Sequence, residues 1–92
     1  MPVIDWNEEK NQFLIKHRGV SFENILDCIL EGLVLSDSPH PNKVKYPNQS
    51  ILVVVIQEYA YVVPYVTSKK GIFLKTIYPS RKYHKLYLKS KK

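Results

Sequence analysis

The chain lacks the features that mark several specialised classes of protein. It has a single cysteine, Cys28, which can form neither an internal disulfide nor a zinc cage. Its longest apolar run, Ile51–Ile56, has six residues, against the roughly 18 that a membrane span needs. The opening residues 1–6 contain neither a basic nor an apolar signal region. We therefore expect a cytoplasmic protein without metal or cofactor, in which Cys28 is buried and reduced.

Acidic residues are almost missing from the second half of the chain. Residues 38–92 hold eleven basic residues and one acid, Glu58, which gives a net charge of +10. Residues 1–37 hold seven acids and three basic residues, which gives −4. A small protein with one strongly cationic half most often uses it to bind an anion, and polyphosphate is the usual candidate.

Strongly diagnostic catalytic motifs are also missing. The chain has no Gly-x-Gly-x-x-Gly, no Gly-rich phosphate loop, no His-Glu-x-x-His and no Gly-x-Ser-x-Gly. Any chemistry must come from cationic and tyrosyl side chains, which lie mainly in the second half.

The helical pattern is clear in the first third. Asp5 or Asn7 can cap a helix over residues 8–17, and Gly19 can end it. Ser21 can cap a second helix that ends at Gly32, with apolar residues at helical spacing. The two helices, joined by a tight turn, predict a helical hairpin.

The rest of the chain predicts strands and one more helix. We expect strands over residues 33–36, 51–56, 60–66 and 71–78, with a loop over 37–50. Pro64 predicts an edge, a bulge or a strand end. A basic helix should begin at Pro79 or Ser80 with an apolar stripe of Tyr83, Leu86 and Tyr87. At 92 residues this is one α+β domain over 1–92, in which helices pack on an antiparallel meander of three to four strands.

The junction of the last strand and last helix is the main candidate site. Arg81 lies in the first helical turn, where free backbone N–H groups and a guanidinium can bind phosphate oxygens. A cation there could stabilise a phosphorane-like transition state during RNA cleavage. The alternative is that Arg81 makes a structural ion pair and the nearby Lys75, Lys82 and Lys85 only keep the surface soluble.

The histidines have alternative roles. His17 ends the first helix, where it either caps carbonyls or acts as a general acid or base. His84, on the last helix, is either a catalytic group or a solvated surface residue. His40, between two prolines, has little to recommend it.

Lysines and tyrosines alternate on the long loop. Lys43, Lys45 and Tyr46 are placed as a single-stranded nucleic acid surface requires, with rings for bases and ammonium groups for phosphates. Tyr59, Tyr61 and Tyr65 share one strand face and are better explained as core packing. The acidic ridge of Glu23, Asp27 and Glu31 is most simply a solvated helix face.

Three segments of the chain resemble the BrnT family of toxins. They are Ile4-Asp-Trp-Asn-Glu-Glu-Lys-Asn11, Lys16-His-Arg-Gly-Val-Ser-Phe-Glu23 and Leu74-Lys-Thr-Ile-Tyr-Pro-Ser-Arg-Lys82. The resemblance covers nearly the whole chain and implies a RelE-like fold and metal-independent RNA cleavage. It also implies a cognate small antitoxin, either acidic or carrying a DNA-binding module, whose complex with the toxin represses its own transcription.

Some residues of this chain match the motifs of the family, and others differ from them. Arg81 matches the closing Ser-Arg position. The family usually has Lys-His-Gly, but here Arg18 separates His17 from Gly19. A role of that histidine has therefore either passed to Arg18, which would then bind RNA, or disappeared. The middle strands lack the arginine often found there, and Lys75 can replace it as a cation.

The leading hypothesis is therefore an endoribonuclease toxin of a type II toxin–antitoxin system. In it, Arg81 and neighbouring lysines stabilise the scissile phosphate, and a histidine or tyrosine moves the 2′-OH proton. The alternative is a non-catalytic module that binds nucleic acid or an acidic protein.

Overall fold

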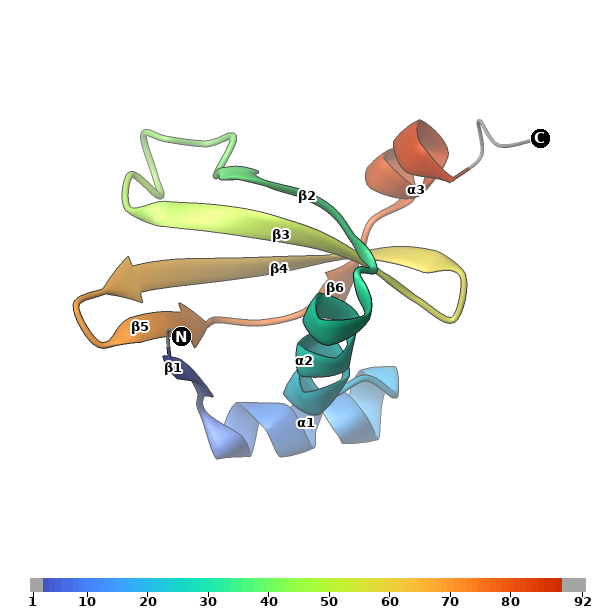
Figure 1. Cartoon of the computed structure of the whole chain (residues 1–92), viewed down its shortest axis with the longest axis horizontal. Helices are drawn as coiled ribbons and strands as arrows, with labels where there is room; N and C mark the ends of the chain where they lie inside the picture. The colour runs from blue at the N-terminus through green and yellow to red at the C-terminus, as the bar shows by residue number, and fades with distance from the viewer. Residues whose placement is uncertain (1–2, 89–92) are drawn as a thin grey trace.

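The structure is a computed structural model that describes residues 3–88, and its fold is α+β, with helices on both faces of one mixed sheet (Figure 1). The strand order is β1-β5-β4-β3-β2, and β6 pairs with β4. Strand β1 is parallel to β5, whereas all other pairs are antiparallel. The elements are β1 (Val3–Trp6), α1 (Glu8–Arg18), α2 (Phe22–Glu31), β2 (Val34–Pro39), β3 (Gln49–Ile56), β4 (Tyr59–Ser68), β5 (Gly71–Leu74), β6 (Tyr78–Pro79) and α3 (Arg81–Tyr87).

The first two helices begin and end where the sequence predicts. Asn7 accepts a hydrogen bond from the Lys10 N–H, and Gly19 ends α1 with a φ of 69°. Ser21 caps α2 and exchanges hydrogen bonds with Asn24 in a capping box. The expected helical hairpin is not confirmed, since α2 runs across α1 in Figure 1.

Helices α1 and α2 cover one face of the sheet. Leu14 from α1 and Phe22 and Ile25 from α2 are fully buried against strand residues such as Val63 and Leu74. Cys28 is in the same core and donates to the Val55 carbonyl. Cys28 is free and buried, as predicted. Burial raises the pKa of its thiol, and nearby acids add to the shift, so the thiol stays protonated.

Contacts of Asn11 and Trp6 join the N-terminal segment to the start of α2, and we call this set of contacts the clamp. Asn11 is fully buried; its carbonyl oxygen accepts from the Phe22 N–H at 2.7 Å, and its amide donates to Glu23 at 2.9 Å. The Trp6 ring stacks on Phe22 with centroids 5.5 Å apart. Two of the segments that carry the BrnT resemblance therefore contact each other here, and these residues stabilise the fold.

The sheet differs from the prediction at several points. Strand β1 was not predicted; it makes the sheet mixed by adding a parallel strand to the antiparallel series β2 to β5. Strand β2 runs to Pro39 and β3 starts at Gln49, so the loop is shorter than expected. Pro39 is tolerated because β2 is at the sheet edge.

The predicted strand over 71–78 is broken. Strand β5 ends at Leu74, residues 75–77 leave the ladder, and β6 then pairs with Tyr61 and Val62. Pro64 lies opposite this break, inside the central strand β4, and its carbonyl accepts from the Lys75 N–H at 2.8 Å. Because the N–H and C=O of one residue in an antiparallel strand point to the same side, the missing N–H of Pro64 faces the segment that leaves the ladder.

Helix α3 covers part of the opposite face. Ser80 caps it, as predicted, and Tyr83 and Tyr87 pack on a second core built from β3 and β4. Leu86 was predicted to belong to the packed stripe but is exposed; Leu88 packs instead. Within residues 3–88, no helix is long and apolar enough to cross a membrane.

Candidate nucleic-acid interface

Helix α3 covers only part of the sheet face on which it packs. Side chains alternate along a strand, and Trp6, Ile72 and Leu74 contact the helical core on the other side. Asp5, Phe73 and Lys75 therefore project to the same face as α3, beyond the area that α3 covers. We call this uncovered area, over β1, β5 and the adjoining ends of β3 and β4, the open face; two hollows lie on it.

The first hollow has a volume of about 410 Å³ and is built from four separate segments. The loop after β2 contributes His40 and Tyr46, whose rings lie 4.5 Å apart. The break after β5 contributes Lys75, and β6 contributes Tyr78. The remaining lining residues are Gln49, Pro64 and Thr76.

The loop is held over this hollow by its own hydrogen bonds. The side-chain oxygen of Asn42 accepts from the Lys45 N–H at 3.1 Å, and the backbone carbonyl of Asn42 accepts from the Tyr46 N–H at 2.9 Å. His40 Nδ1 accepts from the Asn42 N–H at 3.0 Å. An Nδ1 atom that accepts cannot carry the proton, so neutral His40 has its proton on Nε2 and can donate a hydrogen bond.

The Tyr78 phenol lines the first hollow. Burial raises the pKa of Tyr78, and the phenols of Tyr83 and Tyr46 add to the shift. Tyr78 is therefore a hydrogen-bond donor at neutral pH and not a base.

Lys75 is the cation that lines the first hollow, and further cations lie on the loop that contributes Tyr46 and on α3. Lys43 and Lys45 are exposed on the loop, and the Lys45 ammonium lies 5.4 Å from the centre of the Tyr46 ring. Arg81, Lys82 and Lys85 are exposed on α3, which begins directly after β6. The Ser80 hydroxyl accepts from the Tyr83 N–H, so one backbone group at the start of α3 is no longer free for a phosphate.

No known protein family, curated protein or solved structure matches this chain. Among residues 3–88, no three histidine, cysteine, aspartate or glutamate side chains gather in a way that could hold a metal ion.

The structure brings together some of the candidate residues and separates others. Tyr46 and Lys75, which are far apart in sequence, line the same hollow. His17 is exposed on α1, with its ring tilted against that of Phe13 at a centroid distance of 4.3 Å, and α1 packs on the opposite face of the sheet. The Arg18 guanidinium donates to the Ile77 carbonyl and so supports the break in the sheet.

His84 lies apart from the first hollow. Its ring stacks on Tyr59 at 4.2 Å with 13° between the planes, near the β3–β4 turn. Its Nδ1 is buried and has no hydrogen-bond partner among the residues that the structure describes. This position suits packing of α3 on the sheet better than proton transfer.

Two residues of the first hollow were missed from the sequence. His40 was set aside because its neighbours in sequence are a serine and two prolines, and Tyr78 because it was expected inside a continuous strand. Only the pairing of β2 with β3, and of β6 with β4, places them side by side. The one available signal was Pro64, whose missing N–H predicts an interruption in the sheet.

Proposed function

We propose that this protein is a metal-independent endoribonuclease, the toxin of a type II toxin–antitoxin pair, with a RelE-like fold and a relationship to the BrnT family. The observation that carries the proposal is the first hollow, where Lys75 lies with His40, Tyr46 and Tyr78 in the cationic half of the chain. The contact between the two N-terminal BrnT-like segments supports the family relationship.

The charge and the aromatic groups favour RNA as the ligand. Residues 38–92 carry a net charge of +10, and a cationic surface both steers and binds a polyanion, with an affinity that falls as salt rises. Tyr46 and Tyr78 offer rings on which unpaired bases can stack. Lys43 and Lys45 are exposed on the loop, and Lys82 and Lys85 are exposed on α3, so they can bind the phosphate backbone of an RNA that extends beyond the hollow.

The chemistry uses the 2′-OH of the RNA. The 2′-OH gives its proton to hydroxide from the solvent, and its oxygen forms a bond to the adjacent phosphorus. The bond to the 5′ oxygen breaks, this oxygen takes a proton from solvent water, and the products are a 2′,3′-cyclic phosphate and a 5′-OH. The phosphorane-like transition state gains negative charge, which the Lys75 ammonium and the Arg81 guanidinium stabilise.

His40 and the tyrosines act as hydrogen-bond donors in this proposal. His40 Nε2–H can donate to a non-bridging phosphate oxygen. Tyr78 keeps its proton at neutral pH because burial raises its pKa, and it can donate to the leaving 5′ oxygen.

A cleavage assay in EDTA tests the proposal. Lys75→Ala should lower the cleavage rate of a labelled single-stranded RNA by about 10²–10³-fold, as removal of one transition-state cation or donor does elsewhere. Lys75 is exposed, so the fold should survive. Lys16→Ala, the matched control on α1, removes the same charge and should cleave like the wild type. An equal rate in Lys75→Ala and wild type would overturn the role of Lys75.

A growth assay tests Arg81. The wild type should arrest growth when expressed alone, and Arg81→Ala should not. Growth arrest that is equal in both would remove Arg81 from the site. Co-expression with a small acidic antitoxin, or one with a DNA-binding module, should restore growth, since such a partner can cover the cationic surface.

The arrangement of His40 also favours a second function, a module that binds nucleic acid without cutting it. Its Nδ1 already accepts the Asn42 N–H, so its Nε2 is not free to remove a proton. This function predicts salt-sensitive RNA binding with no cleavage product at any protein concentration.

A further inference from the structure

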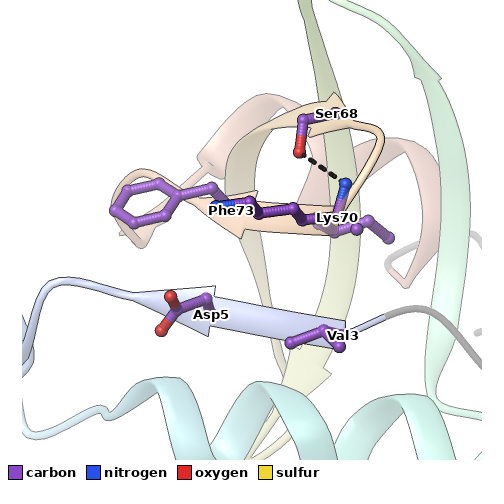
Figure 2. Close-up of a pocket in the computed structure, with 7 residues that line it drawn as sticks. Val3, Asp5, Ser68, Lys70 and Phe73 are labelled. Atoms are coloured by element: carbon purple, nitrogen blue, oxygen red, sulfur yellow. Dashed lines mark hydrogen bonds between the residues drawn. The ribbon is translucent and has the colours of Figure 1, made fainter.

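A second hollow, of about 480 Å³, lies beside the first on the open face. Figure 2 shows Val3 and Asp5 along β1 and Phe73 and Lys70 across from them on the β4–β5 hairpin. Asp5 is the register partner of Phe73, so the carboxylate and the ring are neighbours across the parallel pair.

Gly71 shapes the floor of the second hollow. A Cβ at Gly71 would lie 2.1 Å from the Val3 carbonyl oxygen, and its φ of 141° is one that side chains disfavour. Only a glycine lets β1 approach β5 here. The backbone of Val3 occupies the place that a side chain would fill.

The Asp5 carboxylate in the second hollow is held in one orientation. Asp5 Oδ1 accepts from the Trp6 N–H at 2.8 Å, which orients the carboxylate. Asp5 is the single acid among the residues that line either hollow. The apolar walls come from the side chains of Val3 and Phe73. A flat apolar ligand with hydrogen-bond donors on one edge fits this combination.

We propose that the second hollow binds a guanine base of single-stranded RNA, with Asp5 accepting from the base edge and Phe73 stacking on its face. Guanine presents two adjacent donors, N1–H and the N2 amino group, to a carboxylate. Adenine and cytosine present one donor beside an acceptor, and uracil presents one donor between two carbonyls. A carboxylate therefore favours guanine and repels the other three edges in part.

The two hollows lie close enough for one RNA strand to place a base in the second hollow and a neighbouring phosphate in the first. Phe73 lines the second hollow and Lys75 the first, and the Lys75 ammonium lies 5.6 Å from the centre of the Phe73 ring. Residues two apart along a strand are separated by about 6–7 Å, which is close to one nucleotide step. A guanine stacked on Phe73 thus places a neighbouring phosphate at Lys75. In this respect the inference rests on the proposed ribonuclease function and gives it a base preference.

Binding is measured with oligonucleotides that cannot be cut. The probes are 2′-O-methyl tetramers UGUU, UAUU, UCUU and UUUU, whose blocked 2′ oxygen prevents cleavage. Wild-type protein should bind UGUU about tenfold more tightly than the other three, the discrimination expected of a two-donor contact to one carboxylate. Equal affinity for the four probes would overturn the inference.

Three variants complete the test. Asp5→Asn keeps an acceptor for the Trp6 N–H and should bring the four affinities within about twofold, since its amide no longer matches both guanine donors. Phe73→Leu should weaken binding of all four by about tenfold through lost stacking. Asp27→Asn, on the exposed flank of α2, changes the charge equally and should keep the preference. A guanine preference that persists in Asp5→Asn would overturn the role of Asp5.

Unmodified RNA separates this inference from the proposed function. If UGUU is preferred but no RNA is cut, the base site stands and the ribonuclease proposal fails. If RNA is cut without regard to guanine, and Asp5→Asn cuts it identically, the base site fails and the ribonuclease stands. The near-ultraviolet circular dichroism of Trp6, which packs on Phe22, shows whether each variant is folded.

Discussion

Replacing Asn11 by alanine tests whether the N-terminal segments over residues 4–11 and 16–23 act through the fold. The buried carbonyl of Asn11 accepts the Phe22 N–H at 2.7 Å. That N–H lies in the first turn of α2 and has no partner within its own helix. Alanine leaves it buried and unpaired, which costs about 1–3 kcal/mol, and the vacated space adds to this. We expect a total loss of about 2–4 kcal/mol in the free energy of unfolding.

The loss is large for a domain of this size. A chain of this length usually has about 5–15 kcal/mol of stability, and each kcal/mol moves Tm by about 4–8 °C. Thermal and urea unfolding should therefore show a fall in Tm of roughly 10–25 °C. Gln12→Ala is the matched control: its amide makes one exposed hydrogen bond to Glu8, so its effect should stay within about 0.5 kcal/mol.

Asn11→Asp separates the acceptor from the donor. The aspartate keeps an oxygen that can accept from the Phe22 N–H. Its second oxygen faces the carboxylates of Glu23 and Glu8, which in the wild type accept hydrogen bonds from the Asn11 amide. We expect its destabilisation to grow as pH rises from 4 to 7, when all three acids are charged. If Asn11→Ala unfolds within about 0.5 kcal/mol of the wild type, the clamp does not stabilise the protein and this explanation of the segments is wrong.

Three further predictions concern single residues. Gly71→Ala should cost roughly 3 kcal/mol or more, since its Cβ would meet the backbone of β1 at 2.1 Å; an unchanged urea midpoint would refute the close approach. His84→Phe should raise the free energy of unfolding by about 1 kcal/mol, because it removes a buried nitrogen without a partner, and should leave cleavage unchanged; lost cleavage in a folded variant would show a catalytic role. Burial and the hydrogen bond to Asp37 raise the pKa of Tyr65 to about 12. The protonated form is therefore favoured in the folded state, and about 1–2 kcal/mol of stability should disappear as pH rises from 10 to 12, an effect that Tyr65→Phe should abolish.

Local signals predicted the helices well. Asn7, Ser21 and Ser80 act as N-caps and Gly19 and Gly32 as C-caps, because each is determined by the few residues around it. The continuous apolar run of β3 likewise predicted a strand buried on both faces.

Contacts between distant segments could not be predicted. Strand β1 has four residues and pairs with β5 across most of the chain, so no local pattern reveals it. The break after Leu74 depends on Pro64, which meets it only once the sheet has formed. On α3, the stripe that includes Leu86 was wrong because Leu88 and the His84–Tyr59 stack bring a different side of the helix to the sheet.

The candidate site was predicted in part for the same reason. Cationic residues and Tyr46 were identified from their types and spacing, and Lys75 was identified as a cation. Their meeting with His40 and Tyr78 requires the loop, the break and β6 to converge on one hollow. The charge separation also becomes more specific: the acidic flank of α2 and the cationic α3 lie on opposite faces of the sheet.

The most direct test of the central claim is the single-turnover cleavage rate of a labelled single-stranded RNA in EDTA, measured for wild type, Lys75→Ala and Lys16→Ala. The account predicts products that end in a 2′,3′-cyclic phosphate, a rate lower by about 10²–10³-fold for Lys75→Ala, and no change for Lys16→Ala. RNA that stays intact with the wild type at every protein concentration, or an equal rate for all three proteins, would contradict it.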